Sequence, residues 1–231
     1  MSEVSTRYQG EKGREYFEAA GRFGGDQDLG RIWQSRYFVP FCSSDTTVLD
    51  FGCGDGTILR NLPAGRKLGV EVNPYCLERI AAMNAAQPVP LEVRSGVAEW
   101  GEGVADLAIS NHALEHVLEP FQVLRGIFAA LRPGSTFVLV TPFDDWRAKG
   151  QEKWDPTDGQ NHLYTWTPTN IGNLLIEAGF TVQSSTIVTS AWTPKIFWVW
   201  RMFGDRAFGF ASRLVALLKS RREVVTIAKR S

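Results

Sequence analysis

One stretch of the chain combines glycines and acidic residues at a spacing that predicts chemistry. The apolar run 48–51 leads into a turn with three alternate glycines, Gly52, Gly54 and Gly56. Such a turn at the end of a buried strand lets backbone N–H groups approach a ligand closely. Glu71 ends a second apolar run about 20 positions after Gly52, the spacing at which a carboxylate can bind ribose hydroxyls. The stretch predicts a loop for a nucleotide-type cofactor, and a surface Glu at a strand end is the alternative for Glu71.

A second candidate group is the cluster His112-Ala113-Leu114-Glu115-His116. On a helix, positions i, i+3 and i+4 share one face, so His112, Glu115 and His116 could converge on a divalent metal. The order H-x-x-E-H also matches an inverted zinc-protease motif, but that motif needs a helical metalloprotease context and not a turn after a strand. We exclude the protease and assign no metal. The alternative is that His116 packs or hydrogen-bonds beside the cofactor.

Two classes of cofactor-binding loop contain closely spaced glycines. Dinucleotide-binding folds use G-x-G-x-x-G, so that a helix N-terminus meets the pyrophosphate. Here the third glycine, Gly56, comes one residue early, and Thr57 holds the position that this pattern gives to glycine. An NAD-dependent oxidoreductase is therefore a disfavoured alternative. The pattern Asp50-x-Gly52-x-Gly54-x-Gly56 instead resembles the first motif of the class I S-adenosylmethionine-dependent methyltransferases.

The resemblance to this family extends from about Val48 to about Phe180. Glu71 falls where the second motif places its ribose-binding acid. Residues 104–117 look like the strand of the fourth motif with the turn and helix that follow it, and residues 131–140 resemble the next loop and the fifth strand. The set is most similar to the small-molecule members of the type 11 and type 23 methyltransferase-domain group.

The resemblance implies S-adenosylmethionine as the cofactor and S-adenosylhomocysteine as its product. Val97 stands where the family usually has an acidic residue for the adenine amino group, so adenine is expected to lie against apolar side chains and backbone. Cys53 is expected to pack and not to react. The residues that the resemblance assigns to cofactor binding are Asp50, Gly52, Cys53, Gly54, Gly56, Glu71, Val72, Val97, Ala98 and Asn111.

A third histidine, His162, follows a long polar stretch over residues 149–161, whose length and composition are typical of a functional lid. The segment from His162 to Thr167-Pro168 resembles one in which a histidine stands over the methyl-transfer site. We therefore expect His162 to be a general base or a substrate anchor, because a neutral imidazole near pH 7 suits removal of a hydroxyl proton. A loop-stabilising role is the alternative. His116 and His112 are the further catalytic candidates.

The resemblance also implies a fold. It is an α/β, Rossmann-like sheet of seven mostly parallel strands in the order 3-2-1-4-5-7-6, with strand 7 antiparallel and helices on both faces. No linker or repeat divides the chain, so we expect a single domain over residues 1–231. Its expected parts are an N-terminal helical cap (1–45), the core (46–188), a helical insertion between strands 6 and 7 (189–222), and the last strand with the C-terminus (223–231).

The insertion departs from the tight hairpin that joins these two strands in the family. From Lys195 to Arg222 it has seven basic residues and one acidic residue, Asp205, among several aromatic residues. Neither apolar half reaches the roughly 18 residues needed to span a bilayer. We expect it to lie on a membrane surface or to contact a lipid-linked acceptor. Packing on the sheet edge or in a homodimer is the alternative.

Composition restricts the cell compartment and the partners. The chain has 231 residues, 44% of them hydrophobic, and equal numbers of basic and acidic side chains (25 each), so no basic footprint for a nucleic acid is expected. Its cysteines, Cys42, Cys53 and Cys76, form no C-x-x-C pair, and the N-terminus lacks the layout of a signal peptide. We expect a cytoplasmic protein, with peripheral membrane contact as an alternative.

The turn after the expected fourth strand restricts the acceptor. Methyltransferases that act on planar amino groups tend to have an Asn/Asp-Pro-Pro-aromatic turn there, whereas this chain has Ser110-Asn111-His112-Ala113. The sequence therefore favours a methyltransferase that acts on a hydroxyl of a small-molecule, sugar or lipid-linked acceptor. The alternative from another class is a non-catalytic adaptor that binds the cofactor and uses the Trp-rich insertion to contact a membrane or a partner.

Overall fold

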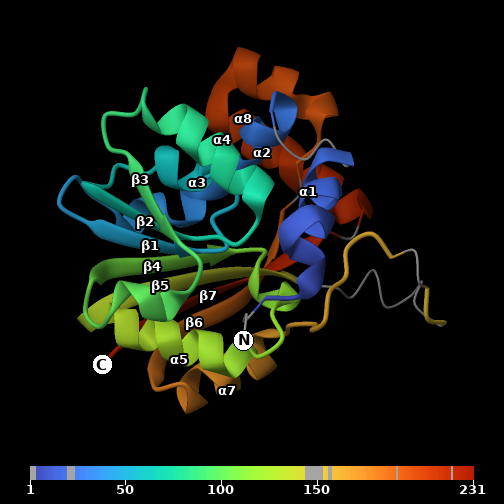
Figure 1. The fold of residues 1–231 in the computed structure, drawn as a ribbon. Helices are drawn as coiled ribbons and strands as arrows, with labels where there is room; N and C mark the ends of the chain where they lie inside the picture. The colour runs from blue at the N-terminus through green and yellow to red at the C-terminus, as the bar shows by residue number, and fades with distance from the viewer. Residues whose placement is uncertain (1–3, 20–23, 144–152, 156–157, 191, 220) are drawn as a thin grey trace.

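The structure is a computed structural model that describes residues 4–19, 24–143, 153–155, 158–190, 192–219 and 221–231. One sheet of seven strands runs through the described residues in the order β3-β2-β1-β4-β5-β7-β6 (Figure 1). Strands β1 to β5 pair in parallel, and β7 is antiparallel to both β5 and β6. The predicted fold class and strand order are therefore confirmed. The strands are β1 (Thr47–Phe51), β2 (Arg66–Val70), β3 (Leu91–Arg94), β4 (Ala105–Asn111), β5 (Leu131–Phe143), β6 (Phe180–Thr189) and β7 (Arg222–Arg230).

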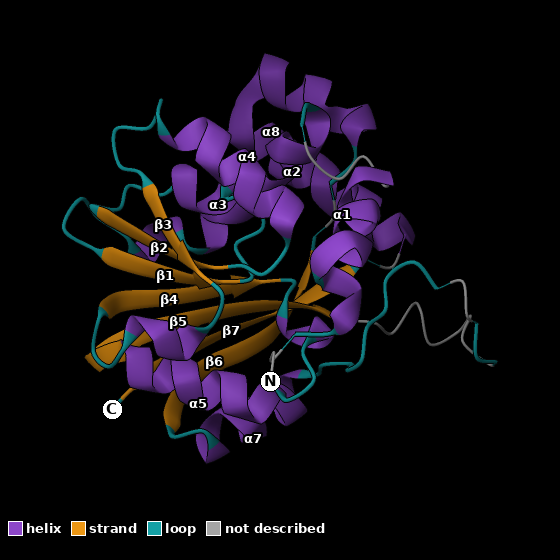
Figure 2. Cartoon of the chain, viewed as in Figure 1, coloured by secondary structure: helices purple, strands orange, loops and turns teal. Residues whose placement is uncertain are grey.

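Helices cover both faces of this sheet, as Figure 2 shows. Helices α5 and α7 lie on one face, and α2, α3, α4 and α8 lie on the other, while α1 stands beside the carboxyl ends of the parallel strands. The long helices are α1 (Gly10–Ala19), α2 (Asp26–Gln34), α4 (Pro74–Asn84), α5 (Pro120–Ala130), α7 (Pro168–Glu177) and α8 (Phe197–Lys219), and α3 is the short Thr57–Arg60.

The central strands β1 and β4 are buried on both faces, which explains why their sequences are nearly continuous apolar runs. Neighbouring residues of β1 face opposite sides, so Val48 joins the core under α3 and α4, whereas Leu49 joins the core under α5 and α7. Leu107 and Ala108 divide in the same way on β4. Burial on both faces holds the ends of β1 and β4 in place, and the turns at those ends carry most of the predicted site residues.

Local sequence signals fix several of the helix ends. Asn73 caps α4 by accepting from the backbone N–H groups of Tyr75 and Cys76, and Pro74 follows it at the first helical position. Thr167 caps α7 by accepting from the Asn170 N–H, and Asn170 Oδ1 accepts in turn from the Thr167 N–H, which completes a capping box.

Three features differ from expectation or lie outside what is described. The turn after β4 does not continue into an α-helix: Leu114–His116 form one turn of 3-10 helix (η5), and His112 has a φ of 53°. The insertion contains a short 3-10 turn (η6, Pro194–Ile196) followed by α8, which has a kink at Gly204, where the backbone leaves helical geometry. Part of the lid predicted over 149–161, residues 149–152 and 156–157, lies outside the described residues. No helix in the described ranges is long and apolar enough to cross a membrane.

Candidate active site

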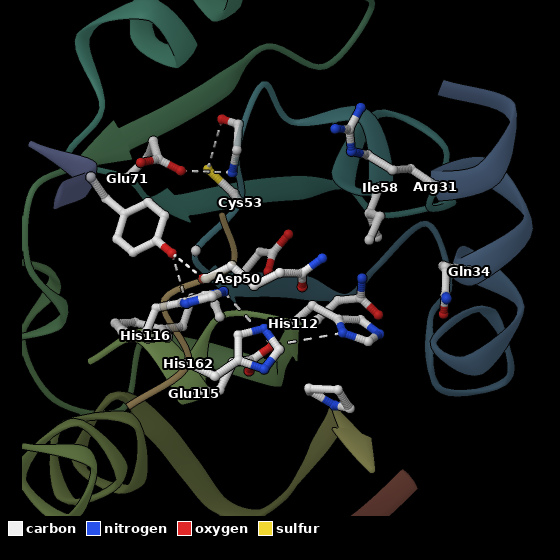
Figure 3. A pocket seen from close by; sticks show the side chains of 18 of the residues that line it. Arg31, Gln34, Asp50, Cys53, Ile58, Glu71, His112, Glu115, His116 and His162 are labelled. Atoms are coloured by element: carbon white, nitrogen blue, oxygen red, sulfur yellow. Dashed lines mark hydrogen bonds and ion pairs between the residues drawn. The ribbon is translucent and has the colours of Figure 1, made fainter. Parts of the chain in front are cut away.

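A cavity of about 470 Å³ opens at the carboxyl ends of β1, β2 and β4 (Figure 3). Side chains from the glycine loop and β2 line one part of it, and the turn after β4, the segment around His162 and the start of β7 line another. The structure thus brings together most of the residues predicted from the sequence. Those in the lining are Asp50, Gly52, Cys53, Gly54, Glu71, Val72, Asn111, His112, His116 and His162.

Gly56, Val97 and Ala98 do not line this cavity. Val97 is 1% exposed and packs in the core beside Gly126 of α5. Gly56 precedes α3 with a φ of 77°, and a Cβ atom there would lie 2.2 Å from Leu91 Cδ2. Packing therefore explains why glycine stands at position 56 and valine at position 97. Cofactor contact at Gly56, Val97 and Ala98 stays a prediction.

Glu71 holds the glycine loop against the end of β2. Its carboxylate accepts hydrogen bonds from the backbone N–H groups of Gly54 (2.8 Å), Val72 (2.8 Å) and Asn73 (2.9 Å). Burial raises the pKa of Glu71 above its usual range, although the three N–H groups act in the opposite direction. The predicted ribose-binding acid is thus fixed beside the loop, with its orientation set by backbone groups.

Gly52 allows the glycine loop to contact the turn after β4. It has a φ of 76°, and a Cβ atom there would lie 2.3 Å from the Cβ atom of Ala113. Any larger residue would push the two turns apart, in addition to straining the backbone. The glycine therefore has a steric role that couples the cofactor loop to the histidine-bearing turn.

Asp50 and Asn111 present unpaired oxygens at this cavity. Asp50 is 2% exposed, and neither its Oδ1 atom nor the Asn111 Oδ1 atom has a hydrogen-bond partner within the described part of the chain. Burial, reinforced by the nearby carboxylate of Glu71, raises the pKa of Asp50 to about 8. Buried acceptors without partners are costly unless a ligand donates to them. The residues present therefore fit a cationic, donor-rich cofactor such as S-adenosylmethionine.

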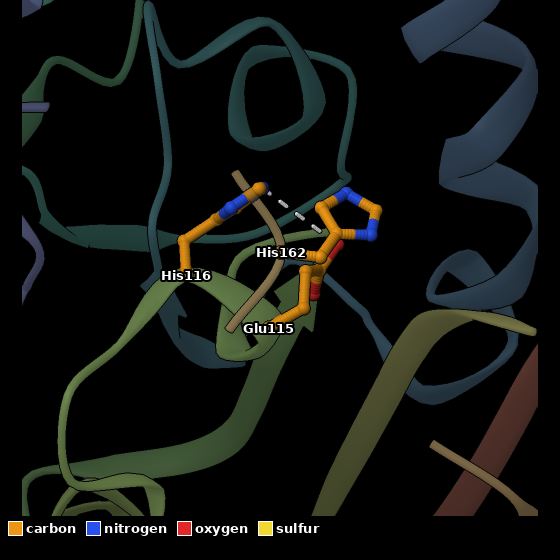
Figure 4. Close-up of side chains that lie close together, drawn as sticks. All are labelled: Glu115, His116 and His162. Atoms are coloured by element: carbon orange, nitrogen blue, oxygen red, sulfur yellow. Dashed lines mark ion pairs between the residues drawn. The ribbon is translucent and has the colours of Figure 1, made fainter. Parts of the chain in front are cut away.

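All three histidines of the chain gather around Glu115 (Figures 3 and 4). The Glu115 Oε1 atom lies 3.7 Å from His112 Nδ1 and 3.9 Å from His116 Nε2. The rings of His116 and His162 meet edge to face with their centroids 4.9 Å apart. His162 comes from a segment about 45 residues further along the chain. The sequence predicted that His112, Glu115 and His116 share one face of a helix. The structure instead gathers them at a 3-10 turn and adds His162 to the group.

Electrostatics give the three ionisable groups of this turn different states. Burial alone would lower the pKa of His112, but the carboxylates of Glu115 and Glu223 outweigh it and raise that pKa to about 10. Burial would raise the pKa of Glu115, yet the neighbouring His112 and the other imidazoles lower it below its usual range. Burial lowers the pKa of His116 despite Glu115. Near pH 7, His112 is therefore cationic, Glu115 is anionic and His116 is neutral.

Tyr8 connects the N-terminal segment to this histidine group. Its hydroxyl lies 2.9 Å from His116 Nδ1 and donates to the Gln160 carbonyl at 2.8 Å. The backbone of Val4 pairs with Val117 in an isolated antiparallel bridge. Segments from the start, middle and later part of the chain therefore meet over one side of the cavity.

Glu223 is a site residue that sequence reasoning missed. It accepts hydrogen bonds from Gln34 Nε2 (2.6 Å) and from the Tyr37 hydroxyl (2.9 Å), and its Oε1 atom lies 3.2 Å from His112 Nε2. It is 7% exposed and lies near the start of β7. The available signal was an acidic residue at the head of an otherwise apolar strand, and its partners on α2 and on the turn after β4 could not be read from spacing.

Comparison with known proteins identifies the family. A family model described as a methyltransferase domain matches residues 28–185, more than half of the chain. The chain belongs to this methyltransferase-domain family. The methyltransferase domain implies S-adenosylmethionine binding, so the expected cofactor is confirmed.

Two curated relatives are distant and longer than the matched part. The chain is 28% identical over 163 residues to an uncharacterized 37.1 kDa protein in transposon Tn4556 of Streptomyces fradiae, covering 62% of this chain and 46% of that protein. It is 27% identical over 119 residues to a 16S rRNA (adenine(1408)-N(1))-methyltransferase of Streptoalloteichus tenebrarius, covering 45% and 55% respectively. The chain thus spans about half the length of the curated relatives that it matches.

Solved structures share the fold at low identity. A chain of the complex between the Haloferax volcanii Trm112 methyltransferase activator and a methyltransferase aligns with a TM-score of 0.66 and 18% identity, over 94% of this chain and 96% of that one. An S-adenosylmethionine-dependent methyltransferase of Mesorhizobium loti aligns with a TM-score of 0.58 and 20% identity, over 85% and 95%. These likenesses confirm the architecture.

The matches also correct the partners expected from the sequence. We expected a small-molecule or lipid-linked acceptor, no nucleic acid, and membrane contact or a homodimer through residues 195–222. The similar proteins instead include an enzyme named for 16S rRNA and a methyltransferase assembled with an activator, so this assignment is wrong. Zero net charge was a poor guide, because basic side chains can still reach a site, and Arg31, Arg221 and Arg222 line this cavity.

Proposed function

We propose that the chain transfers the methyl group of S-adenosylmethionine to a hydroxyl, whose proton leaves to the histidine group around Glu115. The observation that carries the proposal is that this group shares one cavity with Asp50, the glycine loop and Glu71. The cofactor-binding side and a set of proton-accepting side chains thus line the same space. The non-catalytic adaptor has no need of this juxtaposition.

Charge and position assign different proposed roles to the residues that line the cavity. Asp50 supplies a buried carboxylate for a cationic group, and Glu71 and the Gly54 loop supply the acceptors and donors for a ribose. His112 is held as a cation between two carboxylates, so it is a poor base. The proton-accepting role therefore falls to His116, whose pKa is lowered, and to His162 beside it.

The cofactor, when bound, supplies a methyl group that is already activated on a sulfonium. The chain then has to align the nucleophile with that group and remove one proton. Removal of the proton by a positioned imidazole contributes about 10²–10⁴-fold to such a reaction. Glu115 is a positioning residue here, because it contacts His112 and His116 and lies fully buried beneath them.

A second candidate acceptor is a ring nitrogen of a base in RNA. The relative named for adenine methylation of 16S rRNA favours it. Arginines in the cavity lining also suit a phosphate-bearing acceptor, and Arg31, Arg221 and Arg222 are those residues. This candidate needs no general base if the attacked nitrogen carries a lone pair, so it predicts a smaller effect of the histidines.

The first test is isothermal titration of the purified chain with S-adenosylmethionine and, separately, with NAD. We expect micromolar binding of the first and none of the second; binding of neither would favour the adaptor. Methyl-labelled cofactor is then incubated with hydroxyl-bearing compounds and with purified rRNA, and the labelled atom is identified by mass spectrometry.

Variants of the proposed proton acceptors separate the two candidates. His116→Gln and His162→Gln should lower the turnover of a hydroxyl acceptor by about 10²–10⁴-fold with cofactor affinity unchanged. Tyr164→Phe is the matched control, because Tyr164 bonds to the Leu118 carbonyl and lies outside the cavity lining. Unchanged turnover in both histidine variants would refute the proton-acceptor assignment, and labelling of rRNA alone would favour the base nitrogen.

A further inference from the structure

Glu115 poses a problem that methyl transfer does not solve. Its side chain is 0% exposed, and neither carboxylate oxygen has a hydrogen-bond partner within the described residues. The nearest charged atom, His112 Nδ1, lies 3.7 Å away, beyond ordinary hydrogen-bond distance. An ionised carboxylate in such a position has an unfavourable desolvation cost that a close charge has to compensate. His112 contacts it from one side without a close hydrogen bond, so both carboxylate oxygens keep acceptor capacity for a second cation.

The side chains around it are the ligand types that bind a transition metal. One ligand atom from each of Glu115, His116 and His162 can be chosen so that all three lie within 4.8 Å of one another. Figure 4 shows the three side chains converging from η5 and from the segment that carries His162. Bonds of about 2.0–2.2 Å to a tetrahedral Zn²⁺ place ligand atoms about 3.5 Å apart, so a closure of about 1 Å completes the site.

The ring of His116 is also oriented as a metal ligand would be. Its Nδ1 atom faces the Tyr8 hydroxyl at 2.9 Å and the Asn161 carbonyl at 3.3 Å. Its Nε2 atom points toward Glu115, at 3.9 Å from Oε1. Metal-binding histidines usually make such an outer hydrogen bond with the nitrogen that does not bind the ion, and this fixes the tautomer and the ring.

We propose that Glu115, His116 and His162 bind one divalent transition-metal ion, with its open coordination positions facing the cavity. Two imidazoles and one carboxylate favour ions such as Zn²⁺, Mn²⁺ or Fe²⁺ over Mg²⁺ and Ca²⁺, which prefer oxygen ligands. The proposal goes beyond methyl transfer and does not depend on it. In the loaded protein His116 and His162 would be ligands and would not accept a proton, and the ion would instead lower the pKa of a hydroxyl or water bound to it.

The test is direct metal binding by the full chain, with any histidine tag removed and the protein stripped by a chelator. Co²⁺ is added while its visible absorption is recorded, and Zn²⁺ and Mg²⁺ are titrated by calorimetry. We expect one Co²⁺ or Zn²⁺ per chain and much weaker Mg²⁺ binding. Because the chain contains three histidines, all of them in this cluster, an imidazole-bound signal can come only from here.

Variants locate the ion. Glu115→Gln and His162→Ala should each weaken binding at least about 100-fold, and Tyr8→Phe, which acts through His116, about tenfold. Tyr164→Phe is the matched control and should bind as the parent does, because Tyr164 bonds to the Leu118 carbonyl and lies outside the cavity lining. If Glu115→Gln fails to fold by circular dichroism, His162→Ala carries the test, since it changes a partly exposed side chain.

Two results would overturn the proposal: no binding of Co²⁺ or Zn²⁺ by the parent chain, or parent-like binding by His162→Ala. These measurements need neither cofactor nor acceptor. Failure of metal binding therefore leaves the proposed methyl transfer standing, and a metal-binding protein that does not bind S-adenosylmethionine would fail the proposed function alone.

Discussion

Replacing Gly52 by alanine tests whether the cofactor loop and the histidine-bearing turn are packed against each other. The new Cβ atom would lie 2.3 Å from the Ala113 Cβ atom, so one or both turns have to move. Gly52 also has a φ of 76°, a conformation that costs a residue with a Cβ atom about 1–2 kcal/mol. Overpacking adds about 1–3 kcal/mol. The expected loss in the free energy of unfolding is therefore about 2–5 kcal/mol, the sum of these two effects.

Gly134 provides the matched control. It has a similar φ of 80°, but a Cβ atom there meets nothing within 4 Å. Gly134→Ala therefore measures the backbone cost alone, and the reduced entropy of the unfolded chain affects both variants equally. Urea unfolding of the two variants gives the difference, which we expect to be about 1–3 kcal/mol greater for Gly52→Ala.

A double-mutant cycle completes the experiment. Adding Ala113→Gly to Gly52→Ala removes the collision and leaves the backbone strain, so the coupling between the two positions should be about 1–3 kcal/mol. The single variant should also lose affinity for S-adenosylmethionine, because the loop that carries Gly54 moves away from Glu71. Equal stabilities of Gly52→Ala and Gly134→Ala, with coupling within about 0.5 kcal/mol, would refute contact between the turns.

Two further predictions follow from the titration of Asp50 and from the cap of α7. The pKa of Asp50 is about 8 in the folded chain against 3.8 ordinarily, so the folded state keeps a proton that the unfolded state loses, and its contribution to stability falls as pH rises from about 4 to about 8. Binding of a cationic cofactor favours the ionised form of Asp50, so affinity for S-adenosylmethionine should rise up to tenfold per pH unit below pH 8, with proton release in calorimetry. Asp50→Asn should remove this pH dependence. A flat affinity profile in the parent would count against the pairing of Asp50 with the cofactor. Thr167→Ala should lower the free energy of unfolding, measured in urea, by about 1 kcal/mol, because the Thr167 hydroxyl accepts from the Asn170 N–H at the start of α7. Thr181→Ala on β6 is the comparison, because this threonine has no capping role. Equal losses in the two variants would contradict the capping assignment.

The sequence was informative where one structural unit lies on contiguous residues. The strand β1, its glycine turn and the acid at the end of β2 are two consecutive steps of a parallel sheet, so spacing placed the glycine loop and Glu71 together, and the family resemblance added Asp50. Caps at Asn73 and Thr167 are equally local. Such features depend on neighbours within a few residues, which is the range over which sequence patterns are physically constrained.

The histidine group shows where this reasoning stops. A spacing of i, i+3 and i+4 brings side chains together only on a helix, and the chain forms a single 3-10 turn after β4 with His112 at positive φ. His112 therefore turns toward Glu223, and His162 comes into contact with His116. These pairings depend on how distant segments pack on the sheet, and no local pattern encodes them.

The family match consequently covers the two sides of the cavity unequally. The matched family region, residues 28–185, contains the glycine loop, Glu71 and the histidines. Tyr8, which orients His116, lies before that region, and Arg221, Arg222 and Glu223 lie after it. The residues proposed to bind the cofactor thus lie inside the matched region, whereas several residues on the proposed acceptor side lie outside it. Family membership therefore determines the methyl donor, and the acceptor has to be found by experiment on the residues outside the match.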